Sequence, residues 1–541
     1  EGVLWIALSL LILILACPSW AATYYADSDC TFSGDGTESY CAEGAGQPGA
    51  FGNLSDAQVF LTGDQSGKKL ALHGSSVFRE LFAPTMSGSS GSPFRITRYG
   101  DSALPDPRID ASAVLDNAAF TLVSGKTKTY QQTVTNGRTY TETKNGVSAY
   151  LINRASIDLV EANPGSWYWS SGVLYLHPSD STNPTTNGYI YEYSARECAL
   201  RLNGVNYIDV DQVHFRGGNA IPADYVGTTV AGNVEIRGST HINLDDIENS
   251  FGNFYGVAVG DNSDYIGVTN SYFHSTKQAA IRFYQNTDHV TASNNIITRA
   301  GYDLATTGET QGIMCDRCKN PLFDGNNITY CGNANESVSG ALAVVGLPDT
   351  NAVVRYNYMA HNPAGGLNYR GTIAGQEAEG DGNTGGLVYG NVSLWNGSYG
   401  DYDYWFRNLD GTGIYNNTGA YSGRYGVKTI PASTETVTIQ NVKFKNNLIA
   451  FPGQNAARVC LITTSTHLSG MDTDYNLYYE ANSGPTIAVG GTNYWSTGTY
   501  KTAVAPKEAS SIGADPKFTS TTNFRLLRGS PAINAGVNVC T

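Results

Sequence analysis

The sequence predicts an all-β fold, organised as a solenoid in which coils of similar length stack on one another. Two features of the 541 residues predict it. The composition is rich in Gly (61) and Tyr (35) with only 15% charged residues, and a strand–turn–strand unit recurs from about residue 198. This composition suits strands and turns and is poor in helix formers. A solenoid also accommodates the length, because it grows by adding coils.

The repeating unit is an apolar strand opened by Gly or Ala, a polar turn, a second strand that contains Asn, and a variable loop. Successive marker asparagines are 25 to 34 residues apart, which indicates a coil of fixed girth carrying loop insertions. An inward turn amide can hydrogen-bond its equivalent in the next coil, so we predict a structural ladder, with Gln212 and Asp246 as two earlier rungs. The marker positions are Asn270, Asn295, Asn327, Asn357, Asn391, Asn417, Asn447 and Asn476.

Residues 1–22 have the character of a signal peptide. The apolar run from Leu4 to Ala16 is too short for a membrane span, and small residues follow it as far as Ala22. A basic segment and an initial Met are missing, so we expect a leader truncated at its start and cleaved near Ala22. Lipid attachment at Cys17 is the alternative. We expect a secreted, periplasmic or cell-surface protein without a membrane span.

Beyond the leader we expect three regions. Residues 23–195 form an irregular β-rich N-terminal region with the first coils, in which residues 166–169 and 173–176 form a hairpin. Residues 196–482 form the core of stacked coils. Residues 483–541 supply the last coils and a cap.

Eight cysteines follow the leader, and an even number in an exported chain favours disulfides. Spacing alone makes Cys30–Cys41 the preferred pair. Cys315 and Cys318 have the spacing of a metal knuckle or redox motif, but no second such pair accompanies them. We therefore expect a structural role for these two cysteines.

The formal net charge is −14, which argues against a nucleic-acid partner, since such proteins carry basic patches. An acidic glycan would require a local basic cleft, or metal ions that bridge two sets of carboxylates.

Three passages carry a resemblance to bacterial secreted right-handed parallel β-helix repeat proteins. They are Gly74–Glu80 with Ser89–Gly100, the asparagine-marked coil series, and the closing Asp515-Pro516 with Ser530–Gly536. The resemblance implies a right-handed parallel β-helix. It also implies the β-helix superfamily of polysaccharide lyases, glycoside hydrolases, epimerases and non-catalytic surface proteins. No motif selects one activity among them, and the resemblance transfers no catalytic residue.

Strand alternation predicts which side chains leave the core. If Ile281, Phe283 and their equivalents point inward, the intervening residues form an outward column on coils about 4.8 Å apart, which can line one cleft. Loops before these strands are rich in functional groups. The outward column contains Arg282, Tyr284, Met314, Asp316, Asn368 and Arg370, and the loops add His274, Lys277, Arg299, Tyr302, Asp303, Glu309, Glu336, His361, Asp401, Tyr402 and Asp403, with Arg407 following.

The first functional hypothesis is a lyase that cleaves a uronate-containing polysaccharide by β-elimination. Arg282, Arg370 or calcium would neutralise the substrate carboxylate, and Lys277, His274 or Tyr302 would act as the base. Tyr284, Asn368, Arg370, Tyr402, Asp403 and Arg407 would bind substrate. The glycine-rich insertion that carries Glu377, Glu379 and Asp381 is a candidate calcium-binding site, although a solvated loop has the same composition.

Two alternatives remain open. A glycoside hydrolase would use two carboxyl groups, for which Asp303, Glu309 and Asp316 are the best candidates. A non-catalytic glycan-binding protein or adhesin would present an aromatic groove without such a pair. In each case the expected partner is a polysaccharide, and we expect a monomer.

Overall fold

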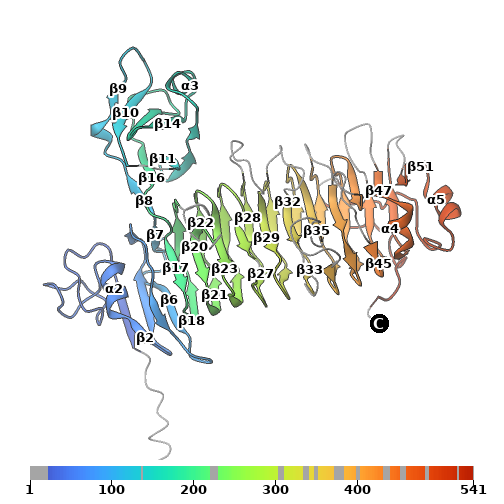
Figure 1. The fold of residues 1–541 in the computed structure, drawn as a ribbon, viewed down its shortest axis with the longest axis horizontal. Coiled ribbons are helices and arrows are strands. Elements are labelled where there is room, and N and C mark those ends of the chain that lie inside the picture. Colours follow the sequence, from blue (N-terminus) through green and yellow to red (C-terminus); the bar gives the residue numbers. More distant parts are fainter. Residues whose placement is uncertain are drawn as a thin grey trace, which may run out of the picture.

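The computed structural model shows a right-handed parallel β-helix, which confirms the predicted fold (Figure 1). It describes residues 22–135, 138–219, 230–284, 286–301, 310–332, 340–345, 351–370, 383–397, 402–430, 439–450, 459–481, 486–520 and 523–539. Three long parallel sheets run along the axis, and each coil contributes one strand to each of them in turn. One coil, for example, consists of β20 (Gly232–Arg237), β21 (Thr240–Asp245) and β22 (Glu248–Ser250).

We number the sheets in the order of these three strands. The first sheet contains β17 (Leu200–Asn203), β20, β23 (Tyr255–Gly260), β26 (Ile281–Phe283), β29 (Gln311–Asp316), β32 (Gly340–Val345), β35 (Gly365–Arg370), β39 (Tyr402–Arg407), β43 (Tyr425–Lys428), β47 (Val459–Thr463), β50 (Ile487–Val489) and β51 (Thr492–Tyr494). The second sheet contains β1 (Thr23–Ala26), β3 (Lys69–His73), β6 (Phe94–Tyr99), β18 (Asn206–Asp211), β21, β24 (Asp264–Thr269), β27 (Thr291–Ser293), β30 (Leu322–Asp324), β33 (Val353–Arg355), β37 (Leu387–Tyr389), β41 (Gly413–Tyr415), β45 (Val442–Lys445) and β48 (Met471–Asp474). The third sheet contains β4 (Val77–Phe78), β7 (Arg108–Asp110), β19 (His214–Arg216), β22, β25 (Tyr272–His274), β28 (Ile296–Thr298), β31 (Asn327–Thr329), β34 (Tyr358–Ala360), β38 (Val392–Leu394), β42 (Thr418–Ala420), β46 (Leu448–Ala450) and β49 (Leu477–Tyr479).

The core is one continuous apolar column inside the coils. Ile281, Ile313, Leu342 and Leu367 lie in register on successive strands of the first sheet and are fully buried. The predicted alternation is therefore correct for this sheet. Burying one such side chain contributes about 1.5–3 kcal/mol, and the contribution repeats with every coil.

An asparagine ladder lies in the turn between the second and third sheets. In each rung the side-chain oxygen accepts from the backbone N–H and the amide of the preceding asparagine, as between Asn326 and Asn357 at 3.0 and 2.9 Å. The members are Asn295, Asn326, Asn357, Asn391, Asn417, Asn447 and Asn476, all buried. The ladder is confirmed for six of the eight predicted positions.

Two predicted markers and both proposed early rungs are wrong by one residue. Asn270, Gln212 and Asp246 have φ angles of 50°, 54° and 51°, and this left-handed conformation directs their side chains outward. Asn327 opens β31 and is exposed, and its neighbour Asn326 occupies the rung. The ladder position in the coil of Asn270 is taken by Ser271, whose N–H donates to Asn295 at 3.0 Å.

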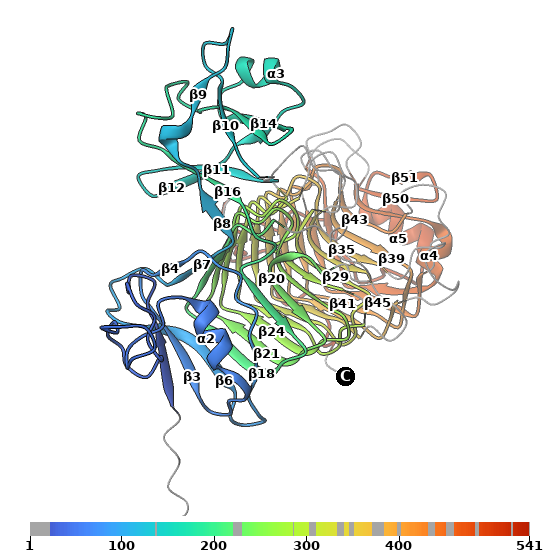
Figure 2. The same cartoon turned by 60° about the vertical axis from the view of Figure 1, so that its left-hand side comes forward.

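The first coils of the β-helix lie before residue 196, in the region 23–195 for which the sequence predicts them. Strands β1, β3 and β6 are the first members of the second sheet, and β6 pairs directly with β18. Residues 112–194 are inserted between coils and form a separate β domain, which stands beside the N-terminal coils in both views (Figures 1 and 2). The sequence placed both parts in one region because neither shows the marker asparagines.

The inserted domain has its own apolar core, which includes Tyr140, Trp167, Leu174 and Tyr191. The predicted hairpin is confirmed as the antiparallel pair β14 and β15. The domain consists of β8 (Ser112–Val114), a 3₁₀ turn (Asn117–Ala119), β9 (Thr121–Leu122), β10 (Tyr130–Thr133), β11 (Tyr140–Lys144), β12 (Val147–Tyr150), β13 (Ile152–Asn153), α3 (Ile157–Ala162), β14 (Ser166–Ser170), β15 (Val173–His177) and β16 (Ile190–Ser194).

Smaller elements complete the chain. They are α2 (Leu54–Phe60), β2 (Thr62–Asp64), β5 (Thr85–Ser87), β36 (Asn383–Thr384), β40 (Leu409–Asp410), β44 (Ile439–Gln440), α4 (Ser465–Ser469) and α5 (Thr497–Val504). Beyond α5 the chain runs back along the coils, where Phe518 and Phe524 pack against Trp395 and Tyr421.

Disulfides join Cys30 to Cys41, as predicted, and Cys315 to Cys318. The second bond gives that pair a structural link between β29 and the turn that follows it. Cys198, Cys331 and Cys460 are buried free thiols, so the even count does not reflect complete pairing. Cys540 and Cys17 lie outside the described residues.

Charged side chains join the inserted domain to the coils. Arg216 of β19 lies 2.7 Å from Glu192 of β16, and Arg79 lies 2.7 Å from the other oxygen of the same carboxylate. Next to them His214 contacts Ser250 Oγ at 2.7 Å and lies 3.6 Å from Glu248. Burial lowers the pKa of His214 from 6.5 to about 4, Arg108 and Arg216 add to this, and Glu248 opposes it.

We expect this histidine to make the fold sensitive to acid. Because the folded state holds His214 neutral, its contribution is complete above pH 6.5 and is lost as the pH falls toward 4. The loss is about 3 kcal/mol in the free energy of unfolding, because the pKa of His214 is about 6.5 in the unfolded chain and about 4 in the folded one. Melting temperatures of the wild type and His214→Gln between pH 4 and 7.5 test this. The wild-type curve should fall more steeply below pH 6.5, and parallel curves would contradict the expectation.

Candidate functional site

The outer face of the first sheet presents the predicted column. Arg282, Met314, Ala343, Asn368, Trp405 and Lys428 are aligned on six successive strands from β26 to β43. A parallel column runs through Asp316, Val345, Arg370 and Arg407. Adjacent members are about one coil spacing, 4.8 Å, apart. The structure therefore brings side chains that are far apart in sequence onto one strip.

At the N-terminal end of the strip, Arg282 is committed to a carboxylate. Its guanidinium donates to Asp316 Oδ2 at 3.0 Å and lies 4.8 Å from the ring centroid of Tyr284. Asp316 also lies 3.3 Å from Arg317. Burial is the main cause that raises the pKa of Tyr284 well above 10, so this phenol stays protonated at neutral pH. The three predicted residues meet, and they form a neutralised, packed group.

Further along, two cations contact one indole ring and a third cation lies on the preceding strand. Arg407 lies 3.8 Å and Lys428 4.1 Å from the ring centroid of Trp405, and Arg370 is aligned with Arg407 on the preceding strand. The indole N–H donates to the carbonyl of Ile430 at 3.0 Å, which holds the ring in place. We call Arg370, Trp405, Arg407 and Lys428 the basic–aromatic cluster. The negative face of the ring lets two cations approach each other.

The cluster is largely shielded from water. Its four side chains are each at most 5% exposed, and Tyr402 packs 5.1 Å from Trp405 on the same strand. Charges in such surroundings act more strongly than charges on an open surface. Asn368 lies beside Trp405 in register and adds an amide to this part of the strip. The arrangement gathers three positively charged side chains on this part of the strip.

Other predicted residues lie elsewhere. His274 belongs to the third sheet, where it contacts Glu248 Oε1 at 3.1 Å. Lys277 donates to the carbonyl of Arg138 and to Asn253 at 2.9 and 3.3 Å, so it anchors the inserted domain. Both were predicted as bases beside Arg282, and the structure gives them these other partners.

Asp403 lies inside the coil, contrary to its predicted role in substrate binding. It is fully buried and accepts from Ser393 Oγ at 3.0 Å. Burial raises its pKa well above the usual range, and hydrogen bonds from Ser393, Asn396 and Ser422 oppose this. Asp403 and the next residue, Tyr404, both lie inside the coil, so simple alternation fails at the start of this strand. Tyr302, Asp303, Glu309, Glu336, Glu377, Glu379, Asp381 and Asp401 lie outside the described residues.

Sequence reasoning missed Trp405 and Lys428. Both could have been found by continuing the outward column of Arg282 and Asn368 through the next two coils. The marker asparagines Asn391 and Asn417 precede β39 and β43 in the chain and would have set that register.

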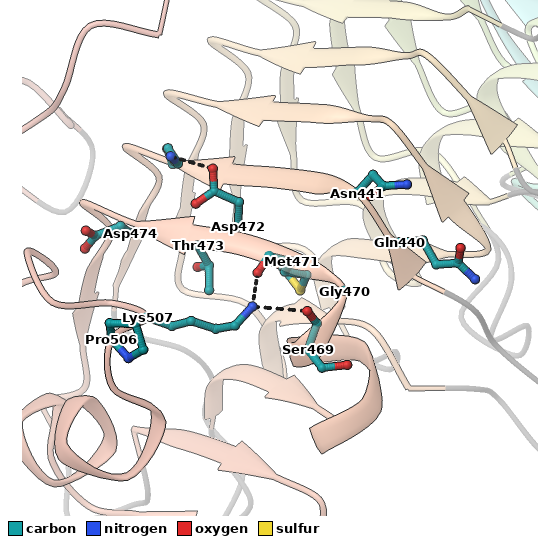
Figure 3. Close-up of a pocket in the computed structure, with 11 residues that line it drawn as sticks. Gln440, Asn441, Ser469, Gly470, Met471, Asp472, Thr473, Asp474, Pro506 and Lys507 are labelled. Atoms are coloured by element: carbon teal, nitrogen blue, oxygen red, sulfur yellow. Dashed lines mark hydrogen bonds and ion pairs between the residues drawn. The ribbon is translucent and has the colours of Figure 1, made fainter.

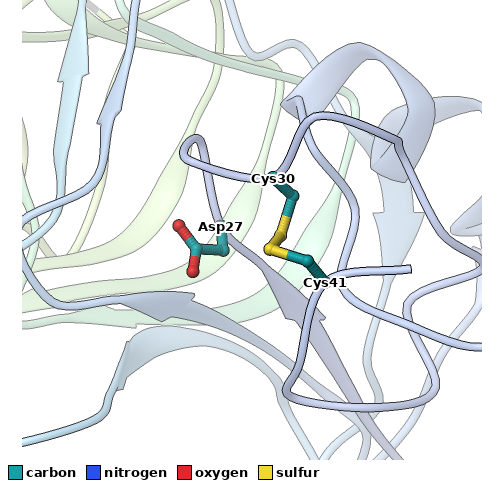
Figure 4. Close-up of side chains that lie close together, drawn as sticks. All are labelled: Asp27, Cys30 and Cys41. Carbon is teal, nitrogen blue, oxygen red and sulfur yellow. A yellow bond between two sulfur atoms is a disulfide. The ribbon is translucent and has the colours of Figure 1, made fainter. Parts of the chain in front are cut away.

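One group of potential metal ligands occurs among the described residues, namely Asp27, Cys30 and Cys41 (Figure 4). The two cysteines form a disulfide, so their sulfur atoms are not thiolate ligands. The predicted calcium ligands are not among the described residues, and calcium stays a prediction.

Two grooves lie on the outer face of the second sheet. One, of about 610 Å³, is lined by residues of β45 and β48 and by Lys507 (Figure 3). Its charges are satisfied internally, because Lys445 lies 2.7 Å from Asp472 and Lys507 donates to the carbonyl of Leu468 at 2.8 Å. The other, of about 480 Å³, is lined by residues of β18, β21, β24 and β27.

Several solved structures are similar to this chain at low sequence identity. The complex of XylC with xylose is similar at a TM-score of 0.62 and 13% identity, over 86% of each chain. The GH136 lacto-N-biosidase from Eubacterium ramulus gives 0.41 and 12%, over 87% of this chain and 66% of that one. Pectate lyase Pel9A gives 0.36 and 12%, over 96% and 92%. No family model matches the chain, and no curated protein matches it.

This chain thus has the fold of the right-handed parallel β-helix proteins, and at these identities the likeness extends to the fold alone. Within the described parts of the chain, no helix is long and apolar enough to cross a membrane.

Proposed function

We propose that this protein is an extracellular enzyme that degrades a polysaccharide, and that it cleaves a uronate-containing glycan by β-elimination. The observation that carries the proposal is the basic–aromatic cluster on three adjacent coils of the first sheet. A protein of net charge −14 repels acidic glycans over most of its surface. A concentrated group of cations on one strip is what an acidic substrate would need.

The chemistry assigns the cations distinct tasks. β-Elimination removes the proton at C5 of a uronate while negative charge develops on its carboxylate. A double bond forms between C4 and C5 as the bond between C4 and the leaving oxygen breaks, and that oxygen takes up a proton from water. Arg370 and Arg407, aligned on adjacent strands, can hold the carboxylate by paired N–H donors. Lys428 on the next strand is the candidate to receive the C5 proton, which requires its neutral form.

A panel of acidic and neutral polysaccharides tests the reaction. Under the proposal, uronate-containing glycans yield new reducing ends together with the ultraviolet absorbance of unsaturated uronates, and neutral glycans yield neither. Reducing ends without absorbance would identify a glycoside hydrolase. Binding without cleavage would identify a glycan-binding protein. Either of these results would overturn β-elimination.

A further inference from the structure

The smaller groove on the second sheet is built from a repeating set of side chains. Its floor is formed by Asp209, Asn243, Gly267 and Thr291, aligned on β18, β21, β24 and β27. Gly267 hollows the floor, because a Cβ there would lie 2.8 Å from Asn243 Oδ1. The loop of Ser90, Gly91 and Pro93 forms one side. The groove lies on a different sheet from the basic–aromatic cluster.

The other side of the groove is a stack of four rings, Tyr207, His241, Tyr265 and His289, which we call the Tyr–His ladder. Successive ring centroids are 4.4, 4.7 and 4.6 Å apart, with interplanar angles of 23°, 17° and 8°. The ring faces are covered by one another, so the edges, with their hydroxyl and imidazole groups, face outward. Tyr265 is 50% exposed.

The backbone does not favour rings at these positions. All four residues have left-handed φ angles, between 48° and 56°. In later coils the same position is Asn320, Asn351, Gly385 and Gly411, residues that tolerate this conformation best. Bulky residues at left-handed φ are uncommon and concentrate at functional sites. The coil itself therefore gives no reason for four consecutive rings.

The chain contains a second ring ladder that shows what such an edge binds. Tyr330, His361, Trp395 and Tyr421 are stacked at left-handed positions after third-sheet strands, 5.1 to 5.4 Å apart. The C-terminal segment covers the Trp395 and Tyr421 end of this ladder, with Phe524 5.3 Å from Trp395 at 72° and 6.1 Å from Tyr421. That ladder is a docking strip for a ring from the same chain. The Tyr–His ladder is the exposed counterpart and borders a groove.

The groove chemistry favours an uncharged ligand with many hydroxyl groups. Asp209 and Asn243 supply acceptors, and the ladder edges supply donors and acceptors. Asp211 and Asp245 lie next to Asp209; burial mainly raises the pKa of Asp209, these carboxylates add to it, and Arg95 opposes it. An anionic ligand would meet this acidic surface. The groups repeat about every 4.8 Å, close to the length of one pyranose residue in a chain.

We propose that this groove is a second, non-catalytic binding site for a neutral glycan chain that lies parallel to the solenoid axis. Repeating sugar hydroxyls would match the repeating floor and ladder groups of four coils. The proposal does not depend on the reaction performed at the first sheet. It would let the protein attach to a neutral polymer while it acts on an acidic one.

Affinity electrophoresis in native gels tests the site, with β-glucan, xylan or galactomannan as neutral probes and polygalacturonate as the acidic probe. The double variant His241→Asn/Tyr265→Asn removes two ladder rings and installs the residue that the same position carries at Asn320 and Asn351. Tyr356→Asn is the matched control, because Tyr356 has φ 56° and is 59% exposed outside the groove. Melting temperatures confirm folding of each variant.

We expect at least one neutral probe to retard the wild type, and its dissociation constant to rise about tenfold or more in the double variant while Tyr356→Asn is unchanged. Lys428→Met should retain binding of the neutral probe. The groove can therefore be tested even if the proposed cleavage reaction is not observed. Absence of retardation by every neutral probe would overturn the site. Equal retardation of the double variant and the wild type would also overturn it. So would stronger binding of polygalacturonate than of the neutral probes, if the double variant loses that binding.

Discussion

Lys428→Met is expected to lower the rate of cleavage of a uronate-containing glycan by about 100- to 1,000-fold, the usual effect of removing one preorganised charge or proton acceptor from an active site. Lys428 lies 4.1 Å from the Trp405 ring centroid, beside Arg407. Methionine keeps an unbranched apolar stem over the indole, so packing should survive. The loss should fall mainly on kcat, since Arg370 and Arg407 remain to bind the carboxylate.

The measurement is the initial rate of appearance of unsaturated uronates, with kcat and KM determined separately. Lys443→Met is the matched control, because Lys443 is an exposed lysine on β45 of the second sheet. It should leave both constants unchanged. Full activity in a folded Lys428→Met protein would remove Lys428 as the base. Full activity in Arg407→Lys as well would move the site away from the basic–aromatic cluster.

Asn326→Ala should lower the free energy of unfolding by about 1–3 kcal/mol, because it leaves buried partners without a hydrogen bond. The Asn326 amide donates to the Ala292 carbonyl at 2.8 Å and to Asn357 at 2.9 Å, and its oxygen accepts from Asn295 at 3.0 and 3.1 Å. In a solenoid such damage interrupts the coupling between neighbouring coils.

The adjacent residue provides the control. Asn327 is exposed on β31, so Asn327→Ala should change stability by no more than about 0.5 kcal/mol. Denaturant unfolding followed by circular dichroism compares the two variants. Equal effects, or a larger effect at Asn327, would mean that the ladder register described above is incorrect. Activity per folded molecule should be unchanged in both variants.

These paired asparagines also show why the ladder was predicted with errors of register. Asn326 and Asn327 are neighbours, as are Asn294 and Asn295, and spacing cannot select between adjacent identical residues. The backbone conformation distinguishes the two residues of each pair. Gly325, which precedes Asn326, and Asn294, which precedes Asn295, both have left-handed φ angles. This conformation decides which of the next side chains points inward. Periodicity therefore predicts that a ladder exists, and local backbone conformation decides its members.

The sequence alone determined the architecture of this protein, because a solenoid repeats the same local pattern in every coil and each coil contacts only its neighbours. Inward and outward alternation likewise placed Arg282, Asp316, Asn368 and Arg370 on one face. Only the tertiary structure decided what those residues do. Arg282 is paired with Asp316, whereas Trp405 is contacted by Arg407 of its own strand and by Lys428, which is 23 residues further along the chain on the next coil. Contacts of this kind depend on which residues of neighbouring coils are aligned. Because the loops between coils vary in length, that alignment cannot be obtained by counting residues along the sequence.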